Sequence, residues 1–400
     1  MRIRPGFEAQ NKSCPEPNIE SGGERLMLRL IVSLLNALSF CRRLSLVRQV
    51  IDKDQELATL LTQLKTADWV AIDTEADSLH AYPEKLCLLQ VSSPVGDHLV
   101  DPLAAFDVSP LLEHLKGREI ILHGADYDLR LLQKSFGFVP RSVFDTMWAA
   151  RLLGSTEFGL THLVSKNLGI TLEKGPQKMN WARRPLTARM ETYARNDTRH
   201  LRPLAELLRE QLKQKDRLHW QEEVCARMVH ECCQQRTQDA DLAWRVKGSD
   251  RLSRHAMAVL RELWAWREEE AIQRNKPPYF ILSHELLVSI SAAATADRPV
   301  KPLLPPHFSL NRQNHLAAAL DRGLKKPAAE HPEVLRSYGP RLGKTEQSRF
   351  DSLKFRRDSR GAELQIDPTL IASRSTLVAL ALDWEANQEG LMAWQRALLA

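Results

Sequence analysis

Two kinds of hydrophobic pattern divide this chain and restrict what it can fold into. From about residue 47 to about residue 215, short apolar runs alternate with segments whose apolar residues recur every three or four positions. Such patterns predict strands and amphipathic helices, respectively. After about residue 216 the strand signals almost disappear, while helical periodicity continues toward the C-terminus. The sequence therefore predicts an α/β domain followed by helical domains.

The α/β part opens with a helix and a set of short strands. Asp54 to Lys65 is predicted to be a helix because four leucines fall on one of its faces. The predicted strands are Trp69 to Asp73, Leu86 to Ser92, His98 to Asp101, Glu119 to His123 and the short Val143-Phe144. A turn sequence, Pro94-Val95-Gly96-Asp97, joins the second and third as a hairpin. Because helices follow the later strands, we expect a mixed sheet with helices packed on it.

Helices account for most of the remaining chain. Asp126 to Phe136 and Met147 to Leu153 follow the later strands, with Asp145 as the expected N-cap of the second helix. A long helix is expected from Thr187 to about Lys215, with Pro203 as a candidate kink. Further helices are predicted at Leu252 to Asn275, Ser283 to Ala293 and Ser375 to Leu399, with a proline-rich linker at residues 299–306.

These patterns predict four segments. They are an N-terminal extension over residues 1–46, expected to be poorly ordered, an α/β domain over 47–215, a helical domain over 216–300 and a second helical domain over 301–400. Leu30 to Phe40 in the extension has the length of a signal-peptide core, but Arg42 and Arg43 follow it without a cleavage motif. The run is also too short to span a bilayer. We interpret the extension as dispensable or as the result of a translation start set too far upstream, with export as the alternative.

The composition is that of a globular protein with a basic surface. Hydrophobic residues make up 43% and charged residues 26% of the chain, which argues against disorder and against a membrane protein. The net charge of +6 suits a polyanionic partner, although an incidental basic surface explains it equally well. The six cysteines show no C-x-x-C spacing, so we expect free thiols and a reducing, cytoplasmic location.

Two acids, Asp73 and Glu75, stand where the first long apolar strand ends. Residues two apart in a strand point to the same face, so these carboxylates can bind one cation together. Ligand sites in α/β sheets also tend to lie at the carboxyl ends of strands. A solvated strand end is the alternative, because D-x-E arises often by chance.

A third acid is selected by helical phase. The predicted helix from Asp126 to Phe136 offers Asp126 and Asp128, and its apolar stripe begins at Leu129. At about 100° per residue, Asp128 lies beside this stripe and Asp126 lies well away from it. We therefore expect Asp128 to face the sheet and the first two acids. Asp126 is expected to interact with the positive N-terminal end of the helix.

A fourth acid, Asp197, follows Tyr193 by one helical turn, so both side chains point the same way. The carboxylate can complete a cation site while the phenol hydrogen-bonds the attacking water. Because the ordinary pKa of tyrosine is about 10, we expect Tyr193 to position a water rather than to act as a free base. An exposed polar helix face is the alternative.

Together these acids predict metal-dependent chemistry. Four converging carboxylates form a strongly negative site that is stable only when divalent cations fill it. Two such ions can activate a water and stabilise the leaving oxygen of a phosphodiester. The expected metal ligands are Asp73, Glu75, Asp128 and Asp197, and Tyr193 completes the expected catalytic set.

The order of these motifs resembles the DEDD exonuclease superfamily, tyrosine subclass, and residues 69–209 look like the ribonuclease D family. The supporting sequences are His123-Gly-Ala-Asp-Tyr-Asp-Leu129, Phe144-Asp-Thr146 and Trp181-Ala-Arg-Arg-Pro-Leu-Thr187, which leads into Tyr193. The resemblance implies a ribonuclease-H-like fold and 3′-to-5′ hydrolysis of RNA to nucleoside 5′-monophosphates with two Mg²⁺ or Mn²⁺ ions. It also implies metal binding by the four acids and water positioning by Tyr193.

The helical half carries a second resemblance. The sequences Ala243-Trp-Arg-Val-Lys-Gly248, Leu260 to Glu270 and Asn275-Lys-Pro-Pro278 resemble the helicase-and-ribonuclease-D C-terminal (HRDC) domain. That domain is a small helical module that binds nucleic acid. Residues from about 340 to 400 resemble a second, weaker copy.

A basic, glycine-containing loop runs from Lys174 to Arg184, between the second and third acid motifs. Because it leads into the helix of Tyr193, its cations are candidates for contacts with RNA phosphates. We select Lys178 and Arg184, with a merely solvated loop as the alternative.

The sequence thus predicts a 3′-to-5′ exoribonuclease acting on RNA with a free 3′ end. Precursors of tRNA are the leading substrate, and neither a membrane nor an obligate protein partner is expected. One alternative is a DNA 3′-exonuclease, since the same acids serve proofreading domains. A non-catalytic RNA-binding scaffold is the other, and the intact motif set argues against it.

Overall fold

The computed structural model describes residues 50–173, 175–234, 240–335 and 342–400. The expectation of a poorly ordered extension over residues 1–46 lies outside the described residues. No helix in the described ranges is long and apolar enough to cross a membrane.

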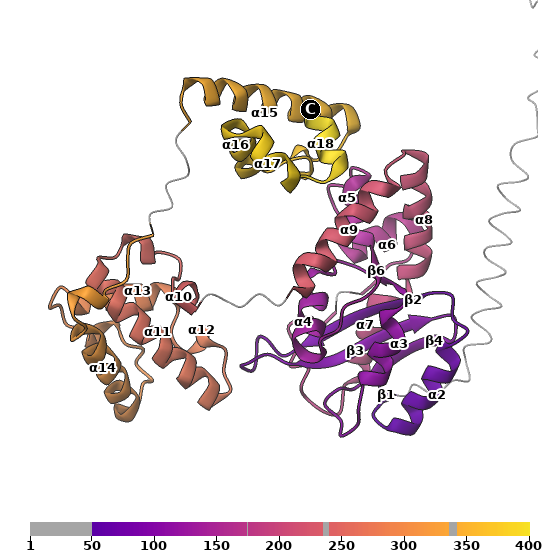
Figure 1. The fold of residues 1–400 in the computed structure, drawn as a ribbon. Coiled ribbons are helices and arrows are strands. Elements are labelled where there is room, and N and C mark those ends of the chain that lie inside the picture. The colour runs from indigo at the N-terminus through magenta and orange to yellow at the C-terminus, as the bar shows by residue number, and fades with distance from the viewer. Residues whose placement is uncertain (1–49, 174, 235–239, 336–341) are drawn as a thin grey trace, which may run out of the picture. The chain divides into compact units, whose positions relative to one another are not determined.

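A six-stranded mixed sheet forms the centre of the first domain (Figure 1). In spatial order its strands are β1 (Val50–Ile51), β4 (Gly96–Val100), β3 (Leu86–Ser93), β2 (Val70–Ala76), β5 (Glu119–Leu122) and β6 (Ser142–Asp145). β2, β3 and β4 are antiparallel neighbours, whereas β2, β5 and β6 are parallel. The predicted mixed sheet and hairpin are confirmed, but the hairpin turn is only Pro94-Val95, because Gly96 and Asp97 already belong to β4. β1 was not predicted, since two residues give no periodic signal.

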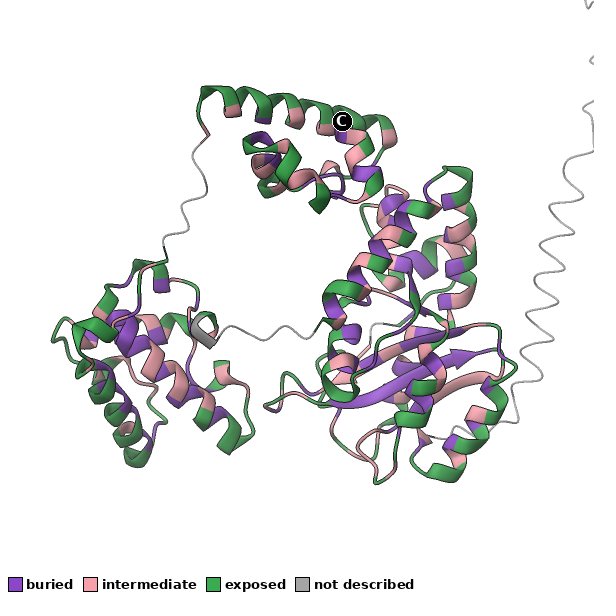
Figure 2. Cartoon of the chain, in the orientation of Figure 1, coloured by how far each residue is buried: buried purple, intermediate pink, exposed green. Residues whose placement is uncertain are grey.

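The sheet lies between two hydrophobic cores because successive residues of a strand point to opposite faces. Val70 and Ile72 of β2 pack in one core, and Ala71 packs in the other. The first core contains α2 (Asp54–Leu64), α3 (Ser109–Lys116) and α4 (Asp126–Phe136). The second contains α5 (Thr146–Leu152), α6 (Leu160–Leu168) and α8 (Leu201–Gln214). Figure 2 shows the sheet buried and the outer helix faces exposed.

The predicted long helix after Thr187 is two helices in the structure. α7 (Ala188–Arg199) ends one residue before α8 begins, and the break falls at His200 rather than at Pro203. Pro203 lies in the first turn of α8, where the missing N–H has no intrahelical partner to lose. Because of this break, α7 packs across β3 and β4, whereas α8 packs in the core that contains α5 and α6.

Two groups of helices follow the α/β domain. The first comprises α10 (Ala240–Ala243), α11 (Arg254–Arg274), α12 (Pro278–Ile281), α13 (His284–Ala294) and α14 (Leu310–Leu324). The second comprises α15 (Lys344–Leu364), α16 (Arg374–Leu382), α17 (Trp384–Asn387) and α18 (Ala393–Leu399). Short 3₁₀ turns lie at Ser249–Arg251, Lys301–Leu303, Ala328–Glu330, Pro368–Leu370 and Gln388–Gly390.

The packing of two helices suggests other domain limits than residues 215 and 300. α9 (Leu218–Cys233) buries Cys225, Met228 and Cys232 in the core that contains α4, so it belongs with the sheet. α14 buries Leu316 and Ala319 in the core of α11. We therefore propose that the α/β domain ends after α9 and that the first helical domain ends after α14.

Candidate active site

Three of the predicted acids meet where α7 packs against β2, an interior strand of the sheet. Asp73 and Glu75 lie two positions apart on β2, and Asp197 lies on α7, which contacts β2, β3 and β4. One oxygen from each carboxylate lies within 4.8 Å of the other two, and all three residues are partly buried. In the described part of the chain, this is the one group of acids, histidines and cysteines with the spacing of a metal site.

Asp128 adjoins this group from the first turn of α4. It is only 6% exposed, and its Oδ1 accepts a hydrogen bond from the hydroxyl of Thr74, the residue between the two β2 acids. Asp126 instead lies at the surface, where Arg130 donates to both of its oxygens at 3.0 Å. The two aspartates therefore point where helical phase predicts.

Two buried oxygens at the site have no hydrogen-bond partner among the described residues. One is Oδ2 of Asp197, and the other is Oε1 of Gln90. Gln90 is fully buried opposite Asp73 in the β2–β3 ladder, and its Nε2 donates to the Asp73 carboxylate at 3.4 Å. Because a buried acceptor without a donor is costly, the Asp197 oxygen is suited to binding a cation.

Burial, together with the charges of neighbouring carboxylates, raises the pKa of all four predicted metal ligands. Burial, reinforced by the charges of Asp197 and Asp128, raises the pKa of Glu75 to about 9. Burial raises the pKa of Asp128 to about 7 despite its hydrogen bonds. It likewise raises the pKa of Asp197 to about 7, although the Tyr193 hydroxyl opposes the shift. Burial and the other three acids hold the pKa of Asp73 well above its ordinary value.

These shifts predict that the metal-free protein loses stability as the pH rises. Each folded-state pKa lies above the unfolded value, so the folded state retains protons that the unfolded chain has lost. This contribution is fully present below about pH 4 and is lost as the pH rises through about 7 and then about 9. We expect the melting temperature of chelator-treated protein to fall across this window, and Mg²⁺ or Mn²⁺ to reduce the fall. A melting temperature of the chelated protein that rises from pH 6 to 9 would contradict the shifts.

Asp145 connects the turn before α4 to the start of α5. It is completely buried, and its two carboxylate oxygens accept from the backbone N–H groups of Gly124, Ala125, Met147 and Trp148 at 2.8–3.2 Å. The predicted N-cap of α5 is confirmed, but the same side chain also binds the turn before α4. Asp145 therefore fixes the start of the helix that carries Asp128.

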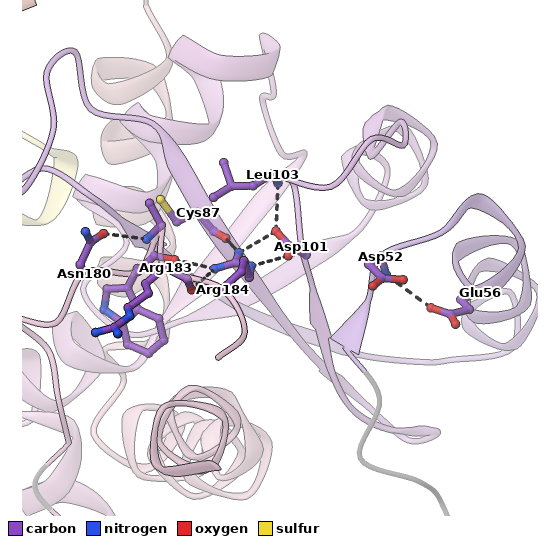
Figure 3. Close-up of polar contacts among 10 residues, drawn as sticks. Asp52, Glu56, Cys87, Asp101, Leu103, Asn180, Arg183 and Arg184 are labelled. Carbon is purple, nitrogen blue, oxygen red and sulfur yellow. Dashed lines mark hydrogen bonds and ion pairs between the residues drawn. The ribbon is translucent and has the colours of Figure 1, made fainter. Parts of the chain in front are cut away.

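The two cations selected as RNA contacts lie in different environments. The guanidinium of Arg184 donates through Nη2 to Asp101 at 2.6 Å and to the carbonyl of Cys87 at 2.7 Å, and its Nη1 donates to the carbonyl of Trp181 at 2.7 Å (Figure 3). These bonds give Arg184 a structural role, and a phosphate contact by Arg184 stays a prediction. Lys178 is exposed, and its carbonyl accepts from His80 Nε2 at 3.0 Å. A phosphate contact by Lys178 stays a prediction.

The acids and Tyr193 line a cleft of about 940 Å³. This volume is near the upper end of the range for ligand pockets, about 300–1,000 Å³. His123, Leu160 and His162 also line the cleft. The cleft is thus large enough for a nucleotide beside the predicted metal ligands.

The α/β domain matches a known class of enzyme. A family profile described as 3′-5′ exonuclease matches residues 48–213, and one described as HRDC domain matches residues 256–298. The solved structure of Escherichia coli RNase D has a TM-score of 0.68 at 24% identity, covering 88% of this chain and 98% of that chain. At this identity the likeness concerns the fold. The first domain is therefore a 3′-5′ exonuclease domain.

Sequence relatives identify the family. The ribonuclease D of Bartonella henselae is 30% identical over 358 residues, which cover 87% of this chain and 86% of that protein. The ribonuclease D of Pseudomonas paraeruginosa is 32% identical over 294 residues, which cover 72% and 77% of the two chains. The chain belongs to the ribonuclease D family, the 3′-to-5′ exoribonucleases.

Proposed function

We propose that this exoribonuclease shortens the single-stranded 3′ ends of structured RNAs and that tRNA precursors are its main substrates. The observation that supports this proposal is the position of the acids in a cleft of about 940 Å³. Unstacked, single-stranded nucleotides can be splayed into such a cleft, whereas a duplex keeps its bases stacked. The Escherichia coli RNase D structure is described as that of an exoribonuclease involved in structured RNA processing.

We propose that two divalent cations bind to the four acids. The donor set fits Mg²⁺ or Mn²⁺, because both prefer carboxylate oxygens and three such oxygens lie within 4.8 Å of one another. Asp73, Glu75 and Asp197 would hold one ion, and Asp128 would complete a second position together with Asp73. When bound, the ions supply the charge that makes a water nucleophilic and that stabilises the leaving 3′-oxygen.

The chain's own residues position the reactants in this proposal. Burial and the charge of Asp197 raise the pKa of Tyr193, so the phenol keeps its proton at neutral pH. A protonated phenol can hold the attacking water by a hydrogen bond but is a poor base. The Thr74 hydroxyl and the Gln90 amide hold the carboxylates of Asp128 and Asp73.

The proposal also covers RNA binding by the helical domains and the cellular location of the protein. The domain that matches the HRDC profile at residues 256–298 would hold the body of the RNA, and residues 342–400 would serve as a second HRDC-like domain. Cys87, Cys225, Cys232 and Cys233 are free thiols, which supports a reducing, cytoplasmic environment.

The substrate proposal is tested with matched 3′ overhangs. We expect a stem with a single-stranded RNA tail to lose nucleoside 5′-monophosphates from its 3′ end faster than the same stem with a DNA tail. Degradation should slow sharply when the stem is reached, as seen by gel analysis of 5′-labelled substrate. Faster loss of the DNA tail would favour a DNA 3′-exonuclease and would overturn the proposed substrate class. A tRNA precursor with a 3′ trailer, in competition with an unstructured RNA of equal length, then tests the tRNA preference.

A further inference from the structure

The ring of Tyr193 is enclosed by the loop that precedes its helix. Trp181, at the end of this loop, is 1% exposed, and its ring lies 6.1 Å from the Tyr193 ring at an interplanar angle of 34°. Both rings pack in the small core formed by α7 with β3 and β4, which includes Met190 and Ala194. One side of the tyrosine is therefore fixed by a buried tryptophan.

Gly175, near the start of the same loop, contacts the Tyr193 ring. A Cβ atom added to Gly175 would overlap the Cγ, Cδ2 and Cε2 atoms of that ring. The backbone of Gly175 is outside the left-handed region, so its conformation is open to other residues. What requires glycine here is the space taken by the tyrosine.

Hydrogen bonds hold the loop from Gly175 to Arg184 at several points. The carbonyl of Lys178 accepts from His80 at 3.0 Å, and the N–H of Met179 donates to the carbonyl of Pro176 at 2.9 Å. At the far end, Arg184 binds Asp101 and main-chain carbonyls, as described above (Figure 3). A loop with these anchors cannot move away from the tyrosine without breaking hydrogen bonds.

We propose that Gly175 and Trp181 form a socket that fixes the Tyr193 ring, and that Gly175 is a positioning residue for the hydrolysis. With the ring fixed, the hydroxyl stays beside Asp197 and Gln177, the two side chains that interact with it. This inference rests on the proposed role of Tyr193 in holding the attacking water. It gives the glycine of this loop a steric function.

The test combines activity with stability in a double-mutant cycle. Gly175→Ala is expected to lower kcat by about 10- to 100-fold with little change in KM, since a misplacement of about 1 Å can cost about 100-fold. In a Tyr193→Ala background, where the ring is absent, Gly175→Ala is expected to change neither kcat nor the metal-free melting temperature. Gly117→Ala is the matched control, because a Cβ there meets nothing within 4 Å and Gly117 lies outside the cleft.

The outcomes separate the two proposals. Wild-type kcat in Tyr193→Phe would refute the role of Tyr193 in catalysis, whatever Gly175→Ala does. If Tyr193→Phe is impaired but Gly175→Ala is not, the socket alone is refuted. An equal loss from Gly175→Ala with and without the Tyr193 ring also refutes it. If Gly175→Ala fails to fold, folding of the double variant supports the socket, and failure of both variants contradicts it.

Discussion

Asp73→Asn is expected to lower kcat by about 10³-fold or more while the protein stays folded, because it removes metal-ion stabilisation worth several kcal/mol. Asp73 belongs to the three-acid group with Glu75 and Asp197. It also accepts a hydrogen bond from the Gln90 side-chain amide, so it lies at the centre of the site. Asparagine keeps the shape of the side chain and removes its charge. The measurement is steady-state hydrolysis of a 5′-labelled RNA in Mg²⁺ and in Mn²⁺.

The matched control for this variant is Asp126→Asn. It makes the same change of charge close by, but Asp126 is exposed and pairs with Arg130 outside the acid group. We expect it to keep nearly all activity. Asp73→Asn should also raise the melting temperature of the metal-free protein at about pH 9, because a buried, crowded charge is removed. Activity of Asp73→Asn within tenfold of wild type would contradict the assignment of Asp73 as a metal ligand.

Asp145→Ala is expected to destabilise the protein by about 3–5 kcal/mol, from a lost N-cap and buried N–H groups left without an acceptor. Four backbone N–H groups donate to this carboxylate, two before α4 and two at the start of α5. Because α4 carries Asp128, the remaining folded protein should also have a lower kcat. Urea denaturation of the metal-free protein measures the first effect, and initial rates well below the melting temperature measure the second.

The control for Asp145 is Asp383→Ala, which removes an exposed N-cap with a single bond, to the N–H of Ala386. We expect that variant to lose about 1 kcal/mol and to keep its activity. If Asp145→Ala cost no more than Asp383→Ala, the proposed support of α4 by Asp145 would be incorrect.

Local patterns in the sequence predict most of the elements of the α/β domain. The apolar runs locate five of the six strands, since buried strands show a distinct composition. β1 is not predicted, because it is only two residues long and is defined by its pairing with β4. The break between α7 and α8 is not predicted either, because histidine does not itself break helices. The packing of α7 across the sheet decides where the break falls.

In the site, too, geometry within a single helix is predictable from the sequence, whereas contacts between distant segments are not. Helical phase selects Asp128, and the one-turn spacing pairs Tyr193 with Asp197, because both depend on geometry within a single helix. Gln90 lies opposite Asp73 only through the register of β2 and β3, which a long intervening loop leaves undetermined. Gly175 likewise shows its role only once its loop is placed against the Tyr193 ring. Contacts between distant segments are what the sequence alone leaves open.

The most direct test of a metal-dependent exonuclease site is a cation titration of RNA shortening. Chelator-treated protein is mixed with a 5′-labelled RNA carrying a single-stranded 3′ tail, and Mg²⁺ or Mn²⁺ is added stepwise. We predict no cleavage without cation, followed by a ladder of one-nucleotide steps from the 3′ end with release of nucleoside 5′-monophosphates. Cleavage that persists in excess chelator, or that releases internal fragments, would contradict the assignment of the four acids as the catalytic centre.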